Sequence, residues 1–329
     1  MRPSPVSLTI DLEQDGVQHG FMKMPCSRDE SAWGSLMTPI TVVKSGEGPT
    51  AILTGANHGD EYEGPVALSK LANSLRPDHI NGRVIIVPFF NFAAFRAGRR
   101  TSPIDGGNMN RVFPGSPDGT ATEKMADYFQ RHLLPISDYV LDIHAGGKTM
   151  DFVPFACAHL LPDKDHEARC VAAMKAFAAP YSMMLLEIDA TGMYDTAAED
   201  MGKVFVSTEL GGGGSSSARS NEVAETGVHN FLVHAGIKHG ELIARESVML
   251  DMPDDRCFIT SLHDGLLEMC VDLGERVEAG EVVACIYDAS RTGAEPVEYR
   301  AEIDGMLAQR HFPGLIAAGD ALAVIAMVV

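Results

Sequence analysis

Residues 49–77 read PTAILTGANHGDEYEGPVALSKLANSLRP and place a strand, a polar turn and a helix in direct succession. The apolar, partly β-branched stretch that ends at Gly55 predicts a buried strand. After the turn, Leu68, Leu71 and Leu75 recur at helical spacing, and Pro77 marks the end of the predicted helix. A strand followed closely by an amphipathic helix is the repeating unit of α/β folds.

The same alternation continues along the chain. Predicted strands cover residues 38–46, 82–91, 137–147 and 203–214, and predicted helices cover residues 121–137, 166–180 and 223–237. Strands that alternate with helices indicate a mostly parallel or mixed sheet with helices on both faces. We therefore predict an α/β catalytic domain over residues 1–245, in which residues 1–40 form peripheral strands.

The pattern changes in residues 246–329, which we predict to form a small β-barrel or sandwich domain. Short apolar stretches alternate there with glycine turns, and DGLL at residues 264–267 is echoed by DGML at residues 304–307. The segment resembles the biotinyl and lipoyl carrier domains. Such carriers need a lysine at a hairpin tip, and residues 264–301 contain none, which argues against a carrier role.

The chain is strongly acidic, with 26 Lys and Arg against 45 Asp and Glu and a net charge of −19. Negative charge of this size repels phosphate backbones and anionic lipid, so we expect neither nucleic acid nor a membrane as a partner. No apolar run is long enough to cross a bilayer, and the N-terminal residues lack the apolar core of a secretory signal. Six cysteines without CxxC spacing are typical of reduced thiols, and we expect a cytoplasmic protein.

Two histidines at predicted strand ends suggest a metal site. His58 lies three residues before Glu61, near the expected start of a helix, so both side chains can share one ion. His144 ends another predicted strand, and Asp142 lies on the same face, where it can orient the imidazole. Two histidines and one glutamate leave a coordination position open, as catalytic zinc requires. Taken alone, the first pair also fits an ordinary turn with a carboxylate near the helix N-terminus.

Glu209 is the predicted general base. It stands at the end of an apolar strand and precedes four glycines, which leave room for its carboxylate to approach water at a metal site. The alternative is a local cap or ion pair.

The long loop over residues 95–120 carries the remaining polar groups. Asn110 and Arg111 offer an amide beside a guanidinium, and a guanidinium binds a carboxylate through two parallel hydrogen bonds. Arg99 or Arg100 can stabilise an oxyanion during amide hydrolysis. Solvated surface arginines are the alternative for these positions.

Taken together, HGDE after Asn57, GNMNR, DIHAG and TELG occur in the order and strand context of the succinylglutamate desuccinylase/aspartoacylase family. The chain resembles that family over residues 40–245, which implies a zinc carboxypeptidase-like fold, one zinc ion per chain and hydrolysis of N-acyl amino acids. The roles that the resemblance implies are as follows: zinc ligands His58, Glu61 and His144; base and acid Glu209; carboxylate grip Asn110 and Arg111; and carbonyl polarisation by Arg100, with Arg99 as the alternative.

One stretch departs from the aspartoacylase pattern, in which an arginine before the base grips the acidic side chain of the substrate. Here residues 194–203, YDTAAEDMGK, contain Asp195, Glu199 and Asp200 and no arginine. Carboxylates on a pocket wall would repel N-acetylaspartate and favour a substrate with a free amine, although a solvated acidic loop has the same composition. The sequence resembles the ectoine-degradation branch of the family, which implies deacetylation of N-α-acetyl-L-2,4-diaminobutyrate to diaminobutyrate and acetate.

Other functions remain open at this point. Aspartoacylase and succinylglutamate desuccinylase chemistry would use the same residues. A zinc carboxypeptidase would also use these residues. A β domain at the mouth of the active site would, however, obstruct the extended groove that a peptide substrate needs. A non-enzymatic carrier or binding module is disfavoured by the missing lysine. The expected partner is a small N-acyl amino acid. The apolar surface of the predicted β domain is also compatible with a homo-oligomer.

Overall fold

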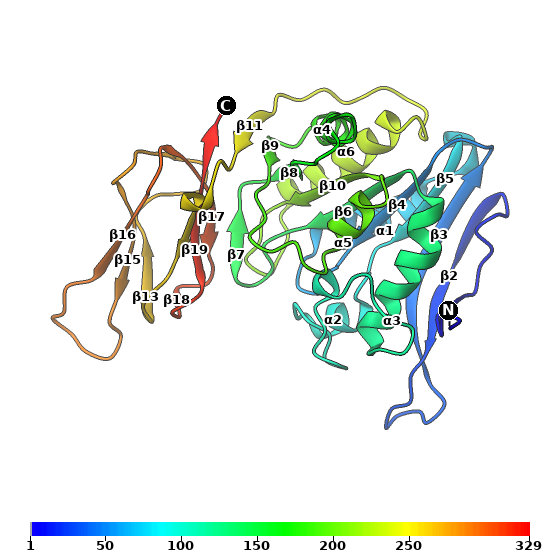
Figure 1. Cartoon of the computed structure of the whole chain (residues 1–329), viewed down its shortest axis with the longest axis horizontal. Helices are drawn as coiled ribbons and strands as arrows, with labels where there is room; N and C mark the ends of the chain where they lie inside the picture. Colours follow the sequence, from blue (N-terminus) through cyan, green and yellow to red (C-terminus); the bar gives the residue numbers. More distant parts are fainter. Residues whose placement is uncertain (1) are drawn as a thin grey trace.

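A mixed sheet forms the centre of the computed structural model, which describes residues 2–329 (Figure 1). Its strand order is β1-β2-β3-β5-β4-β6-β10-β8-β9-β11. Strands β5, β4, β6 and β10 run parallel to one another, whereas β3 and β8 flank them in the antiparallel direction. The bounds are β1 (Ser7–Leu8), β2 (Gly16–Pro25), β3 (Ser35–Ser45), β4 (Thr50–Gly55), β5 (Gly82–Val87), β6 (Tyr139–His144), β8 (Phe155–Ala158), β9 (Tyr181–Met184), β10 (Val204–Glu209) and β11 (Val248–Asp251).

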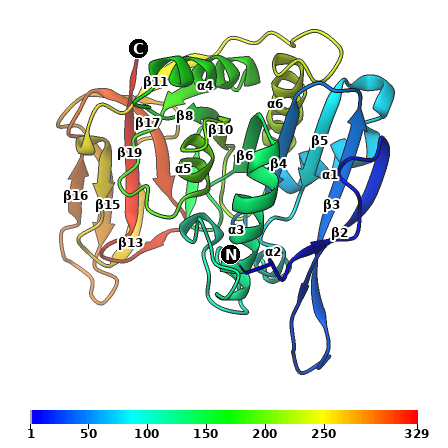
Figure 2. The same ribbon diagram turned by 45° about the vertical axis from the view of Figure 1, so that its right-hand side comes forward.

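Helices cover both faces of this sheet, which confirms the predicted α/β class (Figure 2). Helices α1 (Glu63–Ser74), α4 (Lys164–Phe177) and α6 (Ala218–His234) bury their apolar sides against one face. Helices α3 (Ala121–Tyr128) and α5 (Tyr194–Glu199) pack on the other. Every residue of β4 and β5 is buried, as expected for strands covered on both sides.

The predicted helix over residues 121–137 is α-helical only at its beginning. Thr120 caps it, since its hydroxyl accepts from the backbone N–H of Glu123 at 3.3 Å while the Glu123 carboxylate accepts from the N–H of Thr120 at 2.6 Å. After α3 the chain continues as a π-helical turn and a 3₁₀ turn. The remaining short helices and turns are α2 (Phe92–Ala97), η1 (Pro77–His79), η2 (Met109–Arg111), η3 (Phe129–Leu133), η4 (Leu134–Ile136) and η5 (Asp255–Cys257).

The C-terminal region is built from β-strands, as predicted, and its strands join the central sheet. Strand β19 pairs with β11, and β7 pairs with β17, so backbone hydrogen bonds run from one region into the other. Strands β16-β15-β13-β18 form a separate antiparallel sheet. The domain boundary at residue 245 stays a prediction. The bounds are β7 (Met150–Phe152), β12 (Phe258–Thr260), β13 (Gly265–Met269), β14 (Arg276–Val277), β15 (Val282–Tyr287), β16 (Val297–Arg300), β17 (Gly305–His311), β18 (Leu315–Ile316) and β19 (Ala321–Val328).

The six cysteines are free thiols, and three of them, Cys157, Cys170 and Cys257, are buried. Within residues 2–329, no helix has the length and apolar character needed to cross a membrane.

Close packing between α4 and α6 gives a stability prediction. A Cβ atom added to Gly227 of α6 would lie 2.0 Å from the ring of Phe177, which is fully buried in α4. We expect Gly227→Ala to lower the free energy of unfolding by about 1–3 kcal/mol, because overpacking outweighs the better helix propensity of alanine. Urea denaturation measures this, with Glu222→Ala at an exposed position of the same helix as a control expected within about 0.5 kcal/mol of wild type. An unchanged or raised free energy of unfolding for Gly227→Ala would show that α4 and α6 can move apart to accommodate the added methyl group.

Candidate active site

His58 and Glu61 lie in the turn between β4 and α1, where they face each other. Helix α1 begins at Glu63, so Glu61 precedes the helix and does not lie in its first turn as the sequence had suggested. The His58 Nδ1 atom is 2.7 Å from Glu61 Oε1. Packing fixes this turn, because a Cβ on Gly59 would lie 2.0 Å from the carbonyl carbon of Ala94. Only glycine therefore allows the backbone to approach α2 this closely.

His144 ends β6 and brings the second imidazole to the same carboxylate. Its Nδ1 atom is 2.9 Å from Glu61 Oε2, and its Nε2 atom is 2.7 Å from Asp142 Oδ2, as expected for an orienting carboxylate. His58 is held in the same manner, with Nε2 3.1 Å from the side-chain oxygen of Asn108. Both rings therefore direct Nδ1 at Glu61. Asn108 belongs to the GNMNR motif but was not among the site residues predicted from the sequence.

The three residues have the donor set of a catalytic zinc site. His58, Glu61 and His144 are buried, and their ligand atoms lie within 4.8 Å of one another. Burial alone would raise the pKa of Glu61, but the two imidazoles outweigh burial and hold that pKa far below its ordinary value. The carboxylate is therefore ionised and ready to bind a cation. Two imidazole nitrogens and one carboxylate oxygen, with outer hydrogen bonds that fix both rings, fit zinc with an open coordination position.

Glu209 lies beside this cluster, at the end of β10. It is directly opposite His144 in the parallel pairing of β10 with β6. Burial, with the negative charge of Glu61 adding to it, raises the pKa of Glu209 to about 8. Its Oε2 atom is buried and has no hydrogen-bond partner, so one oxygen remains to accept a proton or a hydrogen bond. The location suits a general base. The local cap that the sequence also allowed does not explain why a buried oxygen of Glu209 has no hydrogen-bond partner.

The two arginines considered from the sequence occupy different positions. Arg100 extends toward the cluster, and its Nη1 atom is 3.8 Å from Glu61 Oε1 while the side chain remains 42% exposed. Arg99 acts through its backbone, since its carbonyl oxygen accepts from the N–H of Gly59 at 3.0 Å. The geometry therefore brings the side chain of Arg100 to the His58–Glu61–His144 cluster, and its predicted role in polarising a carbonyl stays a prediction.

Asn110 and Arg111 lie in the η2 turn next to α5. The side-chain oxygen of Asn110 accepts from the backbone N–H of Tyr194 at 3.0 Å, which leaves the amide NH₂ to donate elsewhere. Arg111 is exposed, and its Nη1 donates to the carbonyl of Asn110 at 2.6 Å. A hydrogen bond therefore links Asn110, one of the two predicted carboxylate-binding residues, to α5, which carries the acidic stretch.

The acidic stretch divides between buried and exposed side chains. Asp195 is buried, and Glu199 accepts a 2.9 Å hydrogen bond from His159, whereas Asp200 is exposed. Glu187, in the loop after β9, completes this group. Of the three acidic residues in this stretch, only Asp200 therefore fits the alternative of a solvated loop. His159 and Glu187 were not predicted from the sequence, because neither lies within residues 194–203.

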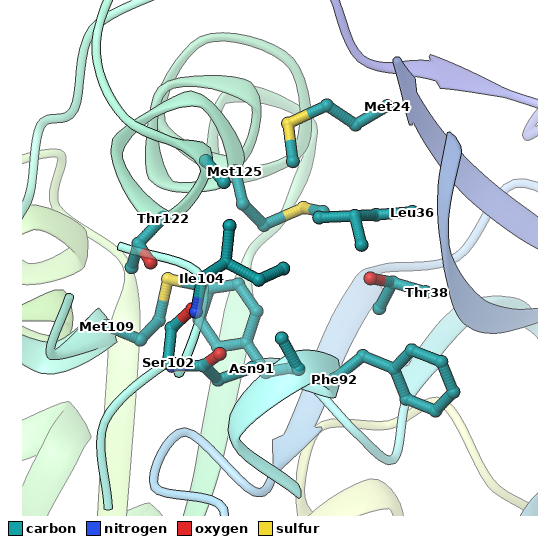
Figure 3. A pocket seen from close by; sticks show the side chains of 13 residues that line it. Met24, Leu36, Thr38, Asn91, Phe92, Ser102, Ile104, Met109, Thr122 and Met125 are labelled. Atoms are coloured by element: carbon teal, nitrogen blue, oxygen red, sulfur yellow. The ribbon is translucent and has the colours of Figure 1, made fainter. Parts of the chain in front are cut away.

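An apolar hollow lies between α3 and the β2–β3 pair (Figure 3). Met24, Leu36 and Met125 point into it, and none of the predicted site residues lines it. Its accessible space is about 30 Å³, which is the volume of about one water molecule. This hollow is too small for an acyl amino acid.

The fold and the site define an amide-hydrolysing enzyme, with a buried His–Glu–His cluster beside the free carboxylate of Glu209. Residues 47–235 match the model of the succinylglutamate desuccinylase/aspartoacylase catalytic domain. The chain belongs to this family.

Individual relatives match over nearly the full length. The N-α-acetyl-L-2,4-diaminobutyric acid deacetylase of Halomonas elongata is 58% identical over 330 residues, which cover 100% of this chain and 96% of that protein. A product-bound structure of the ectoine utilization protein EutE (DoeB) from Ruegeria pomeroyi is 62% identical with a TM-score of 0.98, and the match covers 99% of this chain and 100% of that one. A succinylglutamate desuccinylase structure from Silicibacter sp. TM1040 is 61% identical with a TM-score of 0.97 over 100% of both chains.

Proposed function

We propose that this protein is a zinc-dependent deacetylase that converts N-α-acetyl-L-2,4-diaminobutyrate to L-2,4-diaminobutyrate and acetate in ectoine degradation. The observation that carries the proposal is the buried cluster of His58, Glu61 and His144 with the unpaired Glu209 oxygen beside it. The substrate follows from the similarity to the Halomonas elongata deacetylase and to EutE. We further propose a cytoplasmic enzyme that assembles as a homo-oligomer.

His58, Glu61 and His144 would hold the zinc ion. When bound, zinc supplies a Lewis acid and lowers the pKa of water in the site. Glu209 accepts a proton from the attacking water and then delivers it to the leaving amine. Arg100 stabilises the negative charge that develops on the scissile carbonyl oxygen.

The substrate carboxylate is held at a distance from the reacting bond. Asn110 donates through its amide NH₂, and Arg111 donates two parallel hydrogen bonds to the α-carboxylate. Fixing the carboxylate places the amide in one register relative to Glu209.

Arg111→Lys is expected to raise KM by about 10–100-fold while kcat changes little, because an ammonium cannot make the two-pronged contact of a guanidinium. Steady-state kinetics with N-α-acetyl-L-2,4-diaminobutyrate measures both parameters. Arg99→Lys is the matched control, since Arg99 contributes its backbone carbonyl, which the substitution retains. A large fall in kcat with KM unchanged would mean that Arg111 acts on the reacting bond.

The decisive assay combines metal analysis with three substrates: N-α-acetyl-L-2,4-diaminobutyrate, N-acetyl-L-aspartate and N-succinyl-L-glutamate. One zinc per chain with hydrolysis of the first substrate alone supports the proposal. Preference for either of the acidic substrates would replace it with aspartoacylase or desuccinylase activity at the same site. Absence of both metal and hydrolysis would contradict it.

A further inference from the structure

Two cysteine side chains meet on the separate antiparallel sheet of the C-terminal region. Cys270 directly follows β13, and Cys285 lies in β15, the strand paired with it. Their Sγ atoms are 3.9 Å apart, and the thiol of Cys270 donates a hydrogen bond to the sulfur of Cys285. Both residues are free thiols, and neither has a role in the hydrolytic chemistry above.

Strand register places the two thiols on one face of this sheet. Glu268 of β13 is directly opposite Cys285 in the antiparallel pair. The backbone N–H of Cys270 donates to the carbonyl of Val283 at 2.9 Å, so the pairing continues past the end of β13. Cys270 lies two positions after Glu268 and therefore shares its face. The two cysteines are thus diagonal neighbours across the strand pair.

The local backbone can supply the small movement that a disulfide bond requires. The bond is about 2 Å long and needs Cα atoms within about 7 Å, slightly closer than diagonal neighbours in a regular pair. Strand β18 pairs with β13 at Gly265 and Leu266, which leaves the end of β13 next to Cys270 outside that pairing. The pairing of β15 with β16 is irregular between Val282 and Ala284. Such an irregularity bends a strand locally, so the segments that carry the two thiols can approach each other.

Solvent reaches this pair more easily than it reaches most of the other cysteines. Cys270 is exposed and Cys285 is half-buried. Three of the remaining cysteines are buried: Cys157, Cys170 and Cys257. Cys26 is half-buried and follows β2, at the opposite end of the molecule from β13 and β15 (Figure 1). An oxidant in solution therefore meets Cys270 first, and the thiol nearest to Cys270 is that of Cys285.

The charges around the pair oppose a thiolate but not a disulfide. Burial and the hydrogen bond with the Cys285 thiol raise the pKa of Cys270 to about 11, and the carboxylates of Glu268 and Glu298 act in the same direction. The pair is therefore protonated at neutral pH and reacts slowly, because the thiolate is the nucleophile. A disulfide carries no charge, so the two carboxylates do not destabilise it. A bound glutathione, with its net negative charge, would be repelled by them.

A metal ion fits the pair less well than a disulfide does. Within residues 2–329, neither cysteine belongs to a group of three or more side chains that could hold an ion. The carboxylate of Glu268 accepts from the hydroxyl of Tyr287 at 2.6 Å, and Glu298 forms an ion pair with Arg300. Both nearby carboxylates are therefore engaged, whereas a sulfur–sulfur bond needs no third residue.

We propose that Cys270 and Cys285 form a reversible redox site, which closes to an intramolecular disulfide by exchange with a low-molecular-weight disulfide such as glutathione disulfide. The thiolate of Cys270 attacks one sulfur of glutathione disulfide, whose own bond breaks as the first glutathione thiolate leaves. The thiolate of Cys285 then attacks the Cys270 sulfur and expels the second glutathione thiolate. The two cysteines lose two electrons and two protons, and glutathione disulfide becomes two molecules of glutathione. The new bond links β13 to β15, and excess thiol reverses it.

The test treats the full-length chain with glutathione disulfide and follows its intact mass and its unreduced peptides. Cys26→Ser serves as the parent chain, because it removes the other cysteine that solvent reaches. We expect the parent to lose two hydrogen atoms, to show two fewer free thiols after denaturation, and to yield one linked peptide pair that contains Cys270 and Cys285. Dithiothreitol should restore the original mass. Cys285→Ser in the same parent should instead keep one glutathione on Cys270, because the thiol that would displace it is absent.

Three results would overturn the proposal. The first is a parent chain whose thiols stay unmodified, and the second is a parent chain that keeps a glutathione on Cys270 although Cys285 is present. The third is a disulfide that joins two chains, which a non-reducing gel separates from a bond within one chain. Should Cys285→Ser fail to fold, the linked peptides of the parent chain decide, because they identify both sulfur atoms of the bond directly.

Discussion

Glu209→Gln is expected to retain its metal and to lose about 10²–10⁴-fold in kcat. Glutamine preserves the size of the side chain and the pairing of β10 with β6, but an amide cannot accept the proton of the attacking water. The unpaired Oε2 atom shows that no structural hydrogen bond is lost in the exchange. Single-turnover hydrolysis with parallel metal analysis measures the two effects separately.

The control for this prediction is Asp200→Asn. It changes an exposed carboxylate outside the His58–Glu61–His144 cluster, and we expect its metal content and kcat to stay at the wild-type values. Turnover of Glu209→Gln near the wild-type rate would exclude Glu209 as the base. Loss of metal from that variant would instead show that Glu209 supports binding of the ion.

His144→Ala should abolish metal binding and with it measurable hydrolysis. The imidazole supplies one of only two nitrogen donors, and its removal leaves Asp142 and Glu61 as buried carboxylates without their shared partner. We expect the loss of metal affinity to exceed the 10–100-fold that removal of an outer hydrogen-bond partner costs. Metal titration by a competing chelator measures the affinity directly.

Asp142→Asn provides the graded comparison, because its remaining oxygen can still accept from His144, while the charge and the acceptor for the Thr54 hydroxyl are lost. Its metal affinity should fall by about 10–100-fold and remain measurable. Equal losses in the two variants would mean that Asp142 is as important as a direct ligand. Retention of metal by His144→Ala would require a different set of ligands.

Local sequence patterns were sufficient to predict those parts of the site that lie within one strand or turn. His58 and Glu61 are close because they are three positions apart in one turn, and Asp142 orients His144 because strand residues two positions apart share a face. Local patterns could not decide firmly between Arg100 and Arg99, because the answer depends on how the loop folds back on the turn at Gly59.

The group formed by His159, Glu187, Asp195 and Glu199 shows most clearly what the sequence could not predict. Asp195 and Glu199 stood out by composition, but their meaning depends on His159 and Glu187, which follow two other strands. Pairing of β8 with β9 and β10 brings these residues together. Such long-range pairing is invisible to any window of sequence that covers one element.

The junction of β11 with β19 has a consequence for self-association. A sheet that stopped at β11 would present a row of unpaired N–H and C=O groups, and an edge of this kind recruits strands from other copies of a chain. Strand β19 occupies that edge through the pairs Leu250–Val328 and Asp251–Met327. Strand β19 therefore protects the β11 edge of the catalytic half from pairing with strands of other molecules, which would otherwise lead to aggregation.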